Sequence, residues 1–300
     1  MSEPESKKRV DEPTGTEIFS HEWDGIEELD TPLPRWWLWT FYASILYSIG
    51  YVLVYPAIPL VHGATQGMWG WTSRGELSAE MRAEQVKHAT INAALSATPL
   101  DAIDGNPQLR RQAIEGGKAA FRIHCSTCHG AGAAGGKGYP NLNDDDWLWG
   151  GDVDAIHATI AHGVRQSADT TTRMSQMPAF GRDGILKPAE VQDVVSYVRT
   201  ISKQDAANAG TARGAALFTA NCAVCHGPDG KGNRTLGAPN LTDPIWLYGG
   251  DRASLTETVT NAHYGQMPNW SAQLDPVTVK MLAVYVHSLG GGEKAAAARP

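Results

Sequence analysis

The chain has 300 residues, of which 42% are hydrophobic, and its 25 Lys and Arg against 32 Asp and Glu give a formal net charge of −7. The acidic excess lies in residues 1–35, which carry 4 basic and 10 acidic side chains, whereas residues 108–204 and 205–300 have net charges of +1 and 0. Nothing here suggests nucleic-acid binding. Because the acidic residues are concentrated in the N-terminal tail, the net charge is no evidence that residues 108–300 present an acidic face to a cationic partner.

A hydrophobic segment follows the polar N-terminal tail of residues 1–35. No Lys, Arg, Asp or Glu occurs from Trp36 to Ser73, and a helix of 20 such residues would be about 30 Å long, the thickness of a bilayer's hydrocarbon core. Tryptophans gather at one end of this segment and tyrosines near the other, as is typical of membrane interfaces. We therefore expect an uncleaved transmembrane anchor over residues 36–58, because a signal peptide would have its apolar core nearer the start.

Basic residues on the N-terminal side of the anchor favour a cytoplasmic N-terminus. The residues concerned are Lys7, Lys8, Arg9 and Arg35. Residues 59–107 are expected to form a periplasmic connector, with glycine-rich turns followed by a polar helical stretch over 78–97.

All four cysteines fall in two Cys-x-x-Cys-His pentapeptides, at residues 125–129 and 222–226. Two thiols three positions apart on a helical turn add to the vinyl groups of haem, and the next histidine is then aimed at the iron. The sequence thus predicts two covalently bound c haems. Their expected attachment points are Cys125, Cys128, Cys222 and Cys225, and their proximal ligands His129 and His226. A thioredoxin-like redox pair or half of a zinc site would not explain a histidine directly after both pairs.

The two motifs belong to an internal repeat. After each motif come, in the same order, Pro-Asn-Leu (140–142 and 239–241), Trp-Leu-Trp/Tyr-Gly-Gly-Asp (147–152 and 246–251) and Gln-Met-Pro (176–178 and 266–268). The first copy has about nine extra residues before its Gln-Met-Pro, around residues 165–173. Each copy ends in an apolar-periodic helix after a proline. We expect small helical domains at 108–204 and 205–292 with almost no linker, and a disordered tail at 293–300.

Met177 and Met267 occupy equivalent positions in this repeat. A lone methionine usually fills a core, but the recurrence of Gln-Met-Pro in register favours a distal iron ligand, which would raise the reduction potential and close the sixth coordination site. Met174 is the nearest competitor and has no counterpart in the second copy. Asp152 and Asp251 are expected to cap the helices that follow them. Surface or supporting roles are expected for His124, His162 and His263.

The block His21-Glu-Trp-Asp-Gly-Ile26, the single span and the two haem motifs, each with its Gln-Met-Pro, resemble the dihaem subunit III of cbb3-type (C-family haem–copper) cytochrome c oxidases over nearly the whole chain. The resemblance implies a mainly α fold, with one N-terminal transmembrane helix followed by two tandem class I cytochrome c-like domains. It also implies the axial pairs His129/Met177 and His226/Met267. Similarity to class I cytochromes c implies that the carbonyls of Pro140 and Pro239 orient the proximal histidines.

By the same resemblance, the chain would be an electron-transfer subunit of the bacterial inner membrane, with periplasmic haem domains and no bond chemistry of its own. In that family, electrons pass from a periplasmic cytochrome c through the two haems to a monohaem subunit and on to the oxygen-reducing haem–copper subunit. Two alternatives stay open. One is a free-standing membrane-bound dihaem shuttle for another respiratory enzyme, and the less favoured one is a dihaem peroxidase, which needs an open iron.

Overall fold

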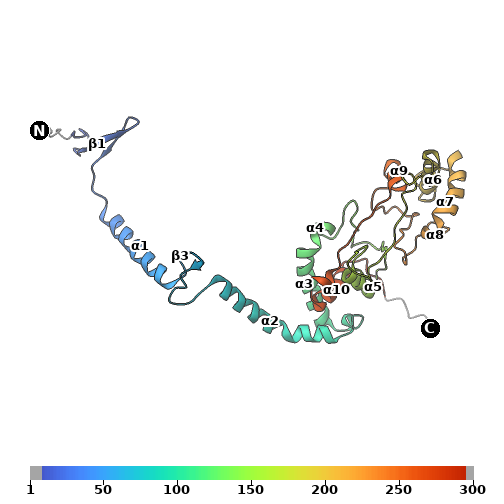
Figure 1. Ribbon diagram of the computed structural model, residues 1–300, viewed down its shortest axis with the longest axis horizontal. Helices are drawn as coiled ribbons and strands as arrows, with labels where there is room; N and C mark the ends of the chain where they lie inside the picture. Colours follow the sequence, from blue (N-terminus) through green and yellow to red (C-terminus); the bar gives the residue numbers. More distant parts are fainter. Residues whose placement is uncertain (1–8, 295–300) are drawn as a thin grey trace. The chain divides into compact units, whose positions relative to one another are not determined.

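A computed structural model describes residues 9–294 of the chain, which divides into two compact units at residues 87 and 88 (Figure 1). The described structure is mainly helical, as predicted, and its strands form two short hairpins. Up to the unit boundary, the elements are β1 (Ile18–Trp23), β2 (Ile26–Leu29), α1 (Arg35–Val54), β3 (Pro59–Leu60), β4 (Gly63–Ala64) and the first part of α2 (Ser73–Ala97).

The segment expected to be an N-terminal tail contains an antiparallel hairpin. In it, β1 pairs with β2, with Trp23 opposite Ile26 and, after a shift of register between Ile18 and Glu22, Ile18 opposite Leu29. Asp24 and Gly25 connect the strands with φ values of 50° and 84°. Two successive residues of positive φ are typical of the tight turn that suits the right-handed twist of a hairpin.

Helix α1 corresponds to the predicted membrane anchor. Its 20 residues are apolar enough to cross a membrane, and none of them is buried within the protein. The helix ends at Val54, inside the predicted anchor of residues 36–58, because Pro56 cannot continue it. The returning chain then supplies donors to the last carbonyls of the helix, since Met68 N donates to Leu53 O (3.0 Å) and Trp69 N to Val54 O (3.4 Å).

The second unit contains the end of α2 and all the helices of the repeat. These elements are a 3-10 turn at Ile103–Gly105, α3 (Pro107–His124), α4 (Ser126–His129), α5 (Val153–His162), α6 (Pro188–Ile201), α7 (Ala209–Asn221), α8 (Ala223–His226), α9 (Arg252–Asn261), a 3-10 turn at Trp270–Ala272 and α10 (Pro276–His287). Asp152 and Asp251 accept hydrogen bonds from Ala155 N and Ser254 N, so both predicted helix caps are confirmed.

The last helices of the two repeats are exchanged. Helix α10, from the second copy, packs against α3 and α5 of the first copy, whereas α6, from the first copy, packs against α7 and α9 of the second (Figure 1). Two cores follow from this arrangement. One contains Phe121, Ile156 and Leu282, and the other contains Val195, Phe218 and Leu255. The expected domain boundary between residues 204 and 205 therefore separates the two repeats along the chain. It does not separate the two packed groups of helices, because each group contains helices from both repeats.

The short connection between α6 and α7 explains the exchange. Only residues 202–208 join the two helices, and so short a link favours an antiparallel helical hairpin. Two ion pairs support this hairpin: Arg199 Nε lies 2.6 Å from Asp205 Oδ2 in the loop, and Arg213 Nη2 of α7 lies 2.7 Å from Asp193 Oδ1 of α6. Helix α7 thus occupies the face of α6 that α3 would otherwise cover, and α3 packs against α10 instead.

A buried glycine lies at the same point of each repeat where the exchanged helices cross. A Cβ atom added at Gly117 of α3 would overlap the carbonyl oxygen of Met281 and lie 2.6 Å from the Cβ of Tyr285, both on α10. A Cβ added at Gly214 of α7 would overlap the carbonyl oxygen of Asp193 on α6. The backbones of both helix pairs are therefore in direct contact.

The expected disordered tail at 293–300 is wrong at its beginning, and residues 295–300 lie outside the described part of the chain. Glu293 accepts hydrogen bonds from Arg234 Nη2 (2.7 Å) and from Gly151 N (3.0 Å), and its own N–H donates to Gly151 O (2.8 Å). Trp147 Nε1 also donates to Gly291 O at 2.7 Å. The chain beyond α10 is thus bound to loops of both repeats as far as Glu293.

Candidate haem sites

Each Cys-x-x-Cys-His motif forms a single helical turn directly after a long helix. Cys125 N donates to Phe121 O (2.9 Å), at the end of α3, and His129 N donates to Cys125 O (2.9 Å). The second motif repeats these bonds, from Cys222 N to Phe218 O (2.8 Å) and from His226 N to Cys222 O (2.9 Å). The tight turn brings the two thiols and the imidazole of each motif to one side of the chain.

Both motif histidines contact the predicted proline carbonyls. His129 Nδ1 lies 3.0 Å from Pro140 O, and His226 Nδ1 lies 3.1 Å from Pro239 O. Because a carbonyl oxygen only accepts, Nδ1 must carry the proton in each ring, and Nε2 keeps the lone pair that a metal would need. Burial lowers the pKa of both histidines, which also favours the neutral, ligating form.

The thiols differ from those of a redox pair. Burial, followed by the neighbouring thiol of the same motif, raises the pKa of Cys125 and of Cys222 to about 11. Reactive Cys-x-x-Cys pairs have a first cysteine whose pKa is lowered to about 7 or less. The environment therefore disfavours the thioredoxin-like alternative.

Met177 and Met267 lie in opposite sites from those implied by the family resemblance. Met177 and Cys222 pack against the same core, and Met177 lines one cavity together with Cys222, Cys225 and His226. Met267 and Cys125 pack against the other core. Each methionine is thus near the attachment motif of the other repeat, and the pairing of His129 with Met177 and of His226 with Met267 does not match this geometry. The physical cause is the helix exchange, because each methionine precedes the helix that crosses over.

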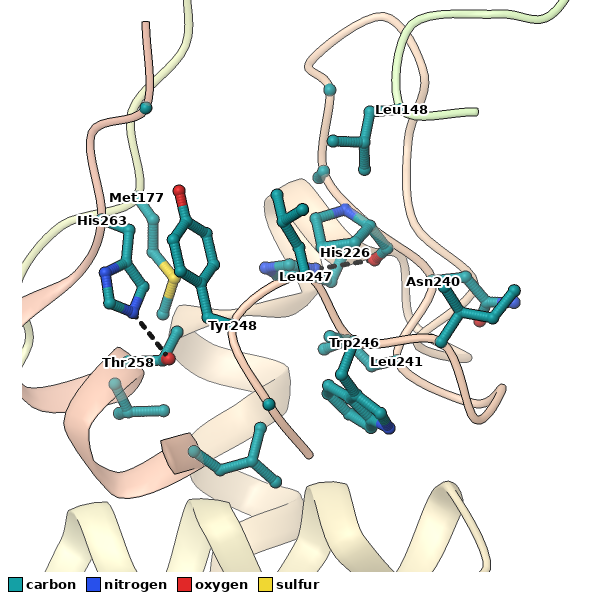
Figure 2. A pocket seen from close by; sticks show the side chains of 18 of the residues that line it. Leu148, Met177, His226, Asn240, Leu241, Trp246, Leu247, Tyr248, Thr258 and His263 are labelled. Carbon is teal, nitrogen blue, oxygen red and sulfur yellow. Dashed lines mark hydrogen bonds between the residues drawn. The ribbon is translucent and has the colours of Figure 1, made fainter. Parts of the chain in front are cut away.

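The cavity around Met177 and His226 has a volume of about 760 Å³, within the roughly 300–1,000 Å³ that is usual for ligand and cofactor sites. Figure 2 shows the side chains of Met177, His226 and Trp246 around it. The cavity combines two attachment thiols, an imidazole with its Nε2 lone pair available and a thioether in a largely apolar surround. These residues fit a covalently attached haem.

Reciprocal contacts join the loops of the two repeats. Gly138 N, in the loop after the first motif, donates to Leu247 O of the second repeat at 2.8 Å. A Cβ added at Gly138 would lie 3.2 Å from the ring of Tyr248, and one at Gly237 would overlap the ring of Trp149. Tyr248 and Trp149 hold equivalent positions in the repeat. Their rings therefore pack on the haem loop of the opposite repeat.

The remaining predicted side chains lie around the sites. Met174 is 60% exposed, unlike Met177. His162 Nδ1 lies 3.0 Å from Asp169 Oδ2, and His263 stacks on Tyr248 with ring centroids 3.7 Å apart and with its Nε2 3.0 Å from Thr258 Oγ1. Each of these two imidazoles therefore has a partner for one of its ring nitrogens.

Arg165 lines the cavity and was missed by the sequence reasoning. It lies in the nine-residue excess of the first copy, so comparison of the two repeats could not reveal it. The sequence also gives no sign of the left-handed backbone conformation of Arg165, because its φ of 54° is seen only in the structure.

The fold and the sites define a membrane-anchored c-type cytochrome with two haem-attachment motifs. Three family models match the chain in order: the N-terminal domain of cytochrome oxidase-cbb3, FixP, over residues 15–62, cytochrome c over 114–202, and cytochrome c oxidase, cbb3-type, subunit III, over 209–286.

Curated relatives match almost end to end. The cbb3-type cytochrome c oxidase subunit CcoP of Cereibacter sphaeroides is 53% identical over 293 residues, which cover 98% of this chain and 100% of that protein. The FixP subunit of Bradyrhizobium sp. (strain ORS 278) is 50% identical over 95% of this chain and 98% of its own length, and that of Azorhizobium caulinodans is 50% identical over 95% and 96%. The chain belongs to the CcoP/FixP family of cbb3-type cytochrome c oxidase subunits, which confirms the resemblance noted from the sequence.

Proposed function

We propose that this electron-transfer subunit carries two covalent c haems whose axial ligands come from both repeats. The haem attached at Cys222 and Cys225 takes His226 and Met177, and the haem attached at Cys125 and Cys128 takes His129 and Met267. The observation that carries this proposal is the common cavity of Met177, Cys222, Cys225 and His226.

When bound at these residues, haem would supply one-electron chemistry through its Fe(II)/Fe(III) couple. The protein holds each imidazole by the hydrogen bond from Nδ1 to a proline carbonyl, which sets the ring orientation and increases the basicity of Nε2. Met177 and Met267 would supply the thioethers, and such ligation would raise the reduction potential and leave no open coordination site for peroxide or oxygen. Two closed sites suit a relay and disfavour the dihaem peroxidase.

In this proposal the relay would accept electrons from a periplasmic or membrane-bound cytochrome c and pass them to the monohaem and haem–copper subunits of the oxidase. Helix α1 would span the inner membrane, with the N-terminus in the cytoplasm and the haem sites in the periplasm. The support is the apolar character of α1 and the basic residues before it, Lys7, Lys8, Arg9 and Arg35.

The crossed ligation is tested in full-length variants that keep one attachment site. Replacing Cys222 and Cys225 by alanine leaves the haem of the first motif, whose methionine ligand gives a weak near-infrared band in the oxidised protein. In this background Met267→Ala should abolish the band and Met177→Ala should preserve it. The reverse result would establish pairing within each repeat, and a band that survives both changes would refute methionine ligation.

Two further experiments separate the alternative functions. Purification in mild detergent should recover b haems, copper and oxygen consumption together with this chain, whereas isolation as a lone c-haem protein would favour the free-standing shuttle. Peroxide turnover by the isolated subunit, or a stable high-spin haem, would favour the peroxidase.

A further inference from the structure

Residues 163–165 bind both of the segments that carry the methionines. Val164 and Met267 exchange two backbone hydrogen bonds, each of 3.0 Å, from the N–H of one residue to the carbonyl of the other. Arg165 N donates to Arg173 O (2.9 Å), in the segment that leads to Met177. The main chain next to Arg165 is therefore fixed to one methionine and to the approach of the other.

The side chain of Arg165 joins the two segments directly. Its Nε donates to Ser175 O at 2.6 Å, and its Nη1 donates to Gly265 O at 2.9 Å. Each of these carbonyls lies two residues ahead of a methionine, Met177 in one case and Met267 in the other. One guanidinium thus fixes both methionine segments at the same distance along the chain from the sulfur-bearing residue.

Further contacts surround this position. Arg165 has a φ of 54°, in the left-handed region that side-chain-bearing residues rarely adopt, and Gln266 Nε2 donates to its carbonyl at 3.2 Å. The guanidinium also lies 5.7 Å from the ring centroid of Tyr264 and lines the cavity of Met177. A planar fork of donors can bridge two carbonyls on different segments, which the compact ammonium of lysine cannot do in the same geometry.

We propose that Arg165 is a positioning residue shared by both haem sites, which couples methionine ligation at one iron to methionine ligation at the other. The inference rests on the proposed histidine–methionine ligation. It goes further because it assigns the position of both thioethers to one side chain outside the repeated motifs. Loss of the fork should loosen both methionine segments, even where the positive charge is kept.

The test compares Arg165→Lys and Arg165→Met in the full-length, haem-loaded chain. Arg182→Met is the matched control, since Arg182 also donates to a carbonyl of the opposite repeat, Asn261 O at 3.4 Å, but is exposed and does not line the cavity. The readouts are the near-infrared methionine band, the two reduction potentials and the affinity for imidazole, which competes with methionine for iron.

Both Arg165 variants should weaken the band, lower both potentials and raise the imidazole affinity of both haems by about tenfold, the effect of one charge-assisted hydrogen bond. The Arg182 variant should match the unsubstituted protein. Unchanged potentials and affinities in both Arg165 variants, or a change confined to one haem, would overturn the proposal. Recovery of normal values by Arg165→Lys would also overturn it, because the effect would then be one of charge alone.

If the Arg165 variants do not retain both haems, Met177→Ala replaces them. Shared positioning predicts that this change raises the imidazole affinity of the haem ligated by Met267 at least about fivefold, and an unchanged affinity overturns it. Failure of the proposed function has a different signature: the unsubstituted oxidised protein would lack the near-infrared band altogether.

Discussion

Gly116 and Gly117 are neighbours on α3, yet alanine should destabilise the protein at Gly117 and not at Gly116. A Cβ at Gly117 would overlap the main-chain oxygen of Met281 on α10, and this clash cannot be relieved by rotation of a side chain. A Cβ at Gly116 would meet the sulfur and terminal methyl of the Met281 side chain, which can rotate away. Alanine also stabilises a helix interior by about 1 kcal/mol relative to glycine.

Forcing α3 and α10 apart costs about 1–3 kcal/mol by overpacking, and the rigid backbone places Gly117→Ala near the upper limit. After the gain in helix propensity, a net loss of about 2 kcal/mol remains. For a unit of this size, this loss lowers the melting temperature by about 4–8 °C. Gly116→Ala should leave the melting temperature unchanged or raise it by up to about 4 °C.

The assay is thermal unfolding of the full-length, haem-loaded chain, followed by circular dichroism at matched concentration. Because α10 belongs to the second repeat, Gly117→Ala should also weaken the methionine band of the haem attached at Cys125 and Cys128, since Met267 precedes α10. Equal melting temperatures for Gly117→Ala and Gly116→Ala would refute the close contact between α3 and α10, and with it this account of the helix exchange.

Three further predictions concern charged groups of the second unit. Asp146 lines the haem cavity, and burial, followed by the carboxylates of Asp243 and Asp144, raises its pKa to about 6. Ionisation above that pH favours Fe(III), so potentiometry should find the potential of the haem at Cys222 falling between about pH 5 and 7, and Asp146→Asn should remove the fall. The raised pKa of Asp146 also affects folding: its protonated carboxyl contributes stability that is present below about pH 4 and lost as the pH rises through 6. Hydrogen bonding from Arg199 lowers the pKa of Asp205 to about 2. The stability that this ionised carboxylate contributes is therefore present above about pH 4 and lost as the pH falls towards 2. Accordingly, Asp205→Asn should lower the melting temperature at pH 7 more than at pH 3. Lys280 Nζ donates to the carbonyls of Leu95 (2.8 Å), Ser96 (3.3 Å) and Thr98 (2.8 Å) and so caps the C-terminal end of α2. Lys280→Met should therefore speed amide hydrogen exchange in the last turn of α2. Unchanged exchange would contradict this capping role.

Local chemistry within the sequence determines much of this protein. The two Cys-x-x-Cys-His motifs require a short helical turn, and α4 and α8 are such turns. Residues within a few positions of each element determine several features: the caps at Asp152 and Asp251, the end of α1 before Pro56, and the starts of α6 and α10 at Pro188 and Pro276. Such features depend on short-range contacts, which neighbouring residues specify.

The partner of each methionine depended on tertiary structure. Gln-Met-Pro occurs in both repeats, and nothing local in the motif distinguishes a ligand of its own repeat's iron from a ligand of the other. The decision lies in the seven residues 202–208, whose shortness pairs α6 with α7 and sends α10 to α3. Arg165 depended on tertiary structure for the same reason, since Ser175 and Gly265 are 90 residues apart and meet at its guanidinium only after the helices have exchanged. The repeated motifs thus identify the candidate ligands, whereas the packing of whole helices decides which attachment motif each methionine lies beside, because crossed and uncrossed arrangements satisfy the same local contacts.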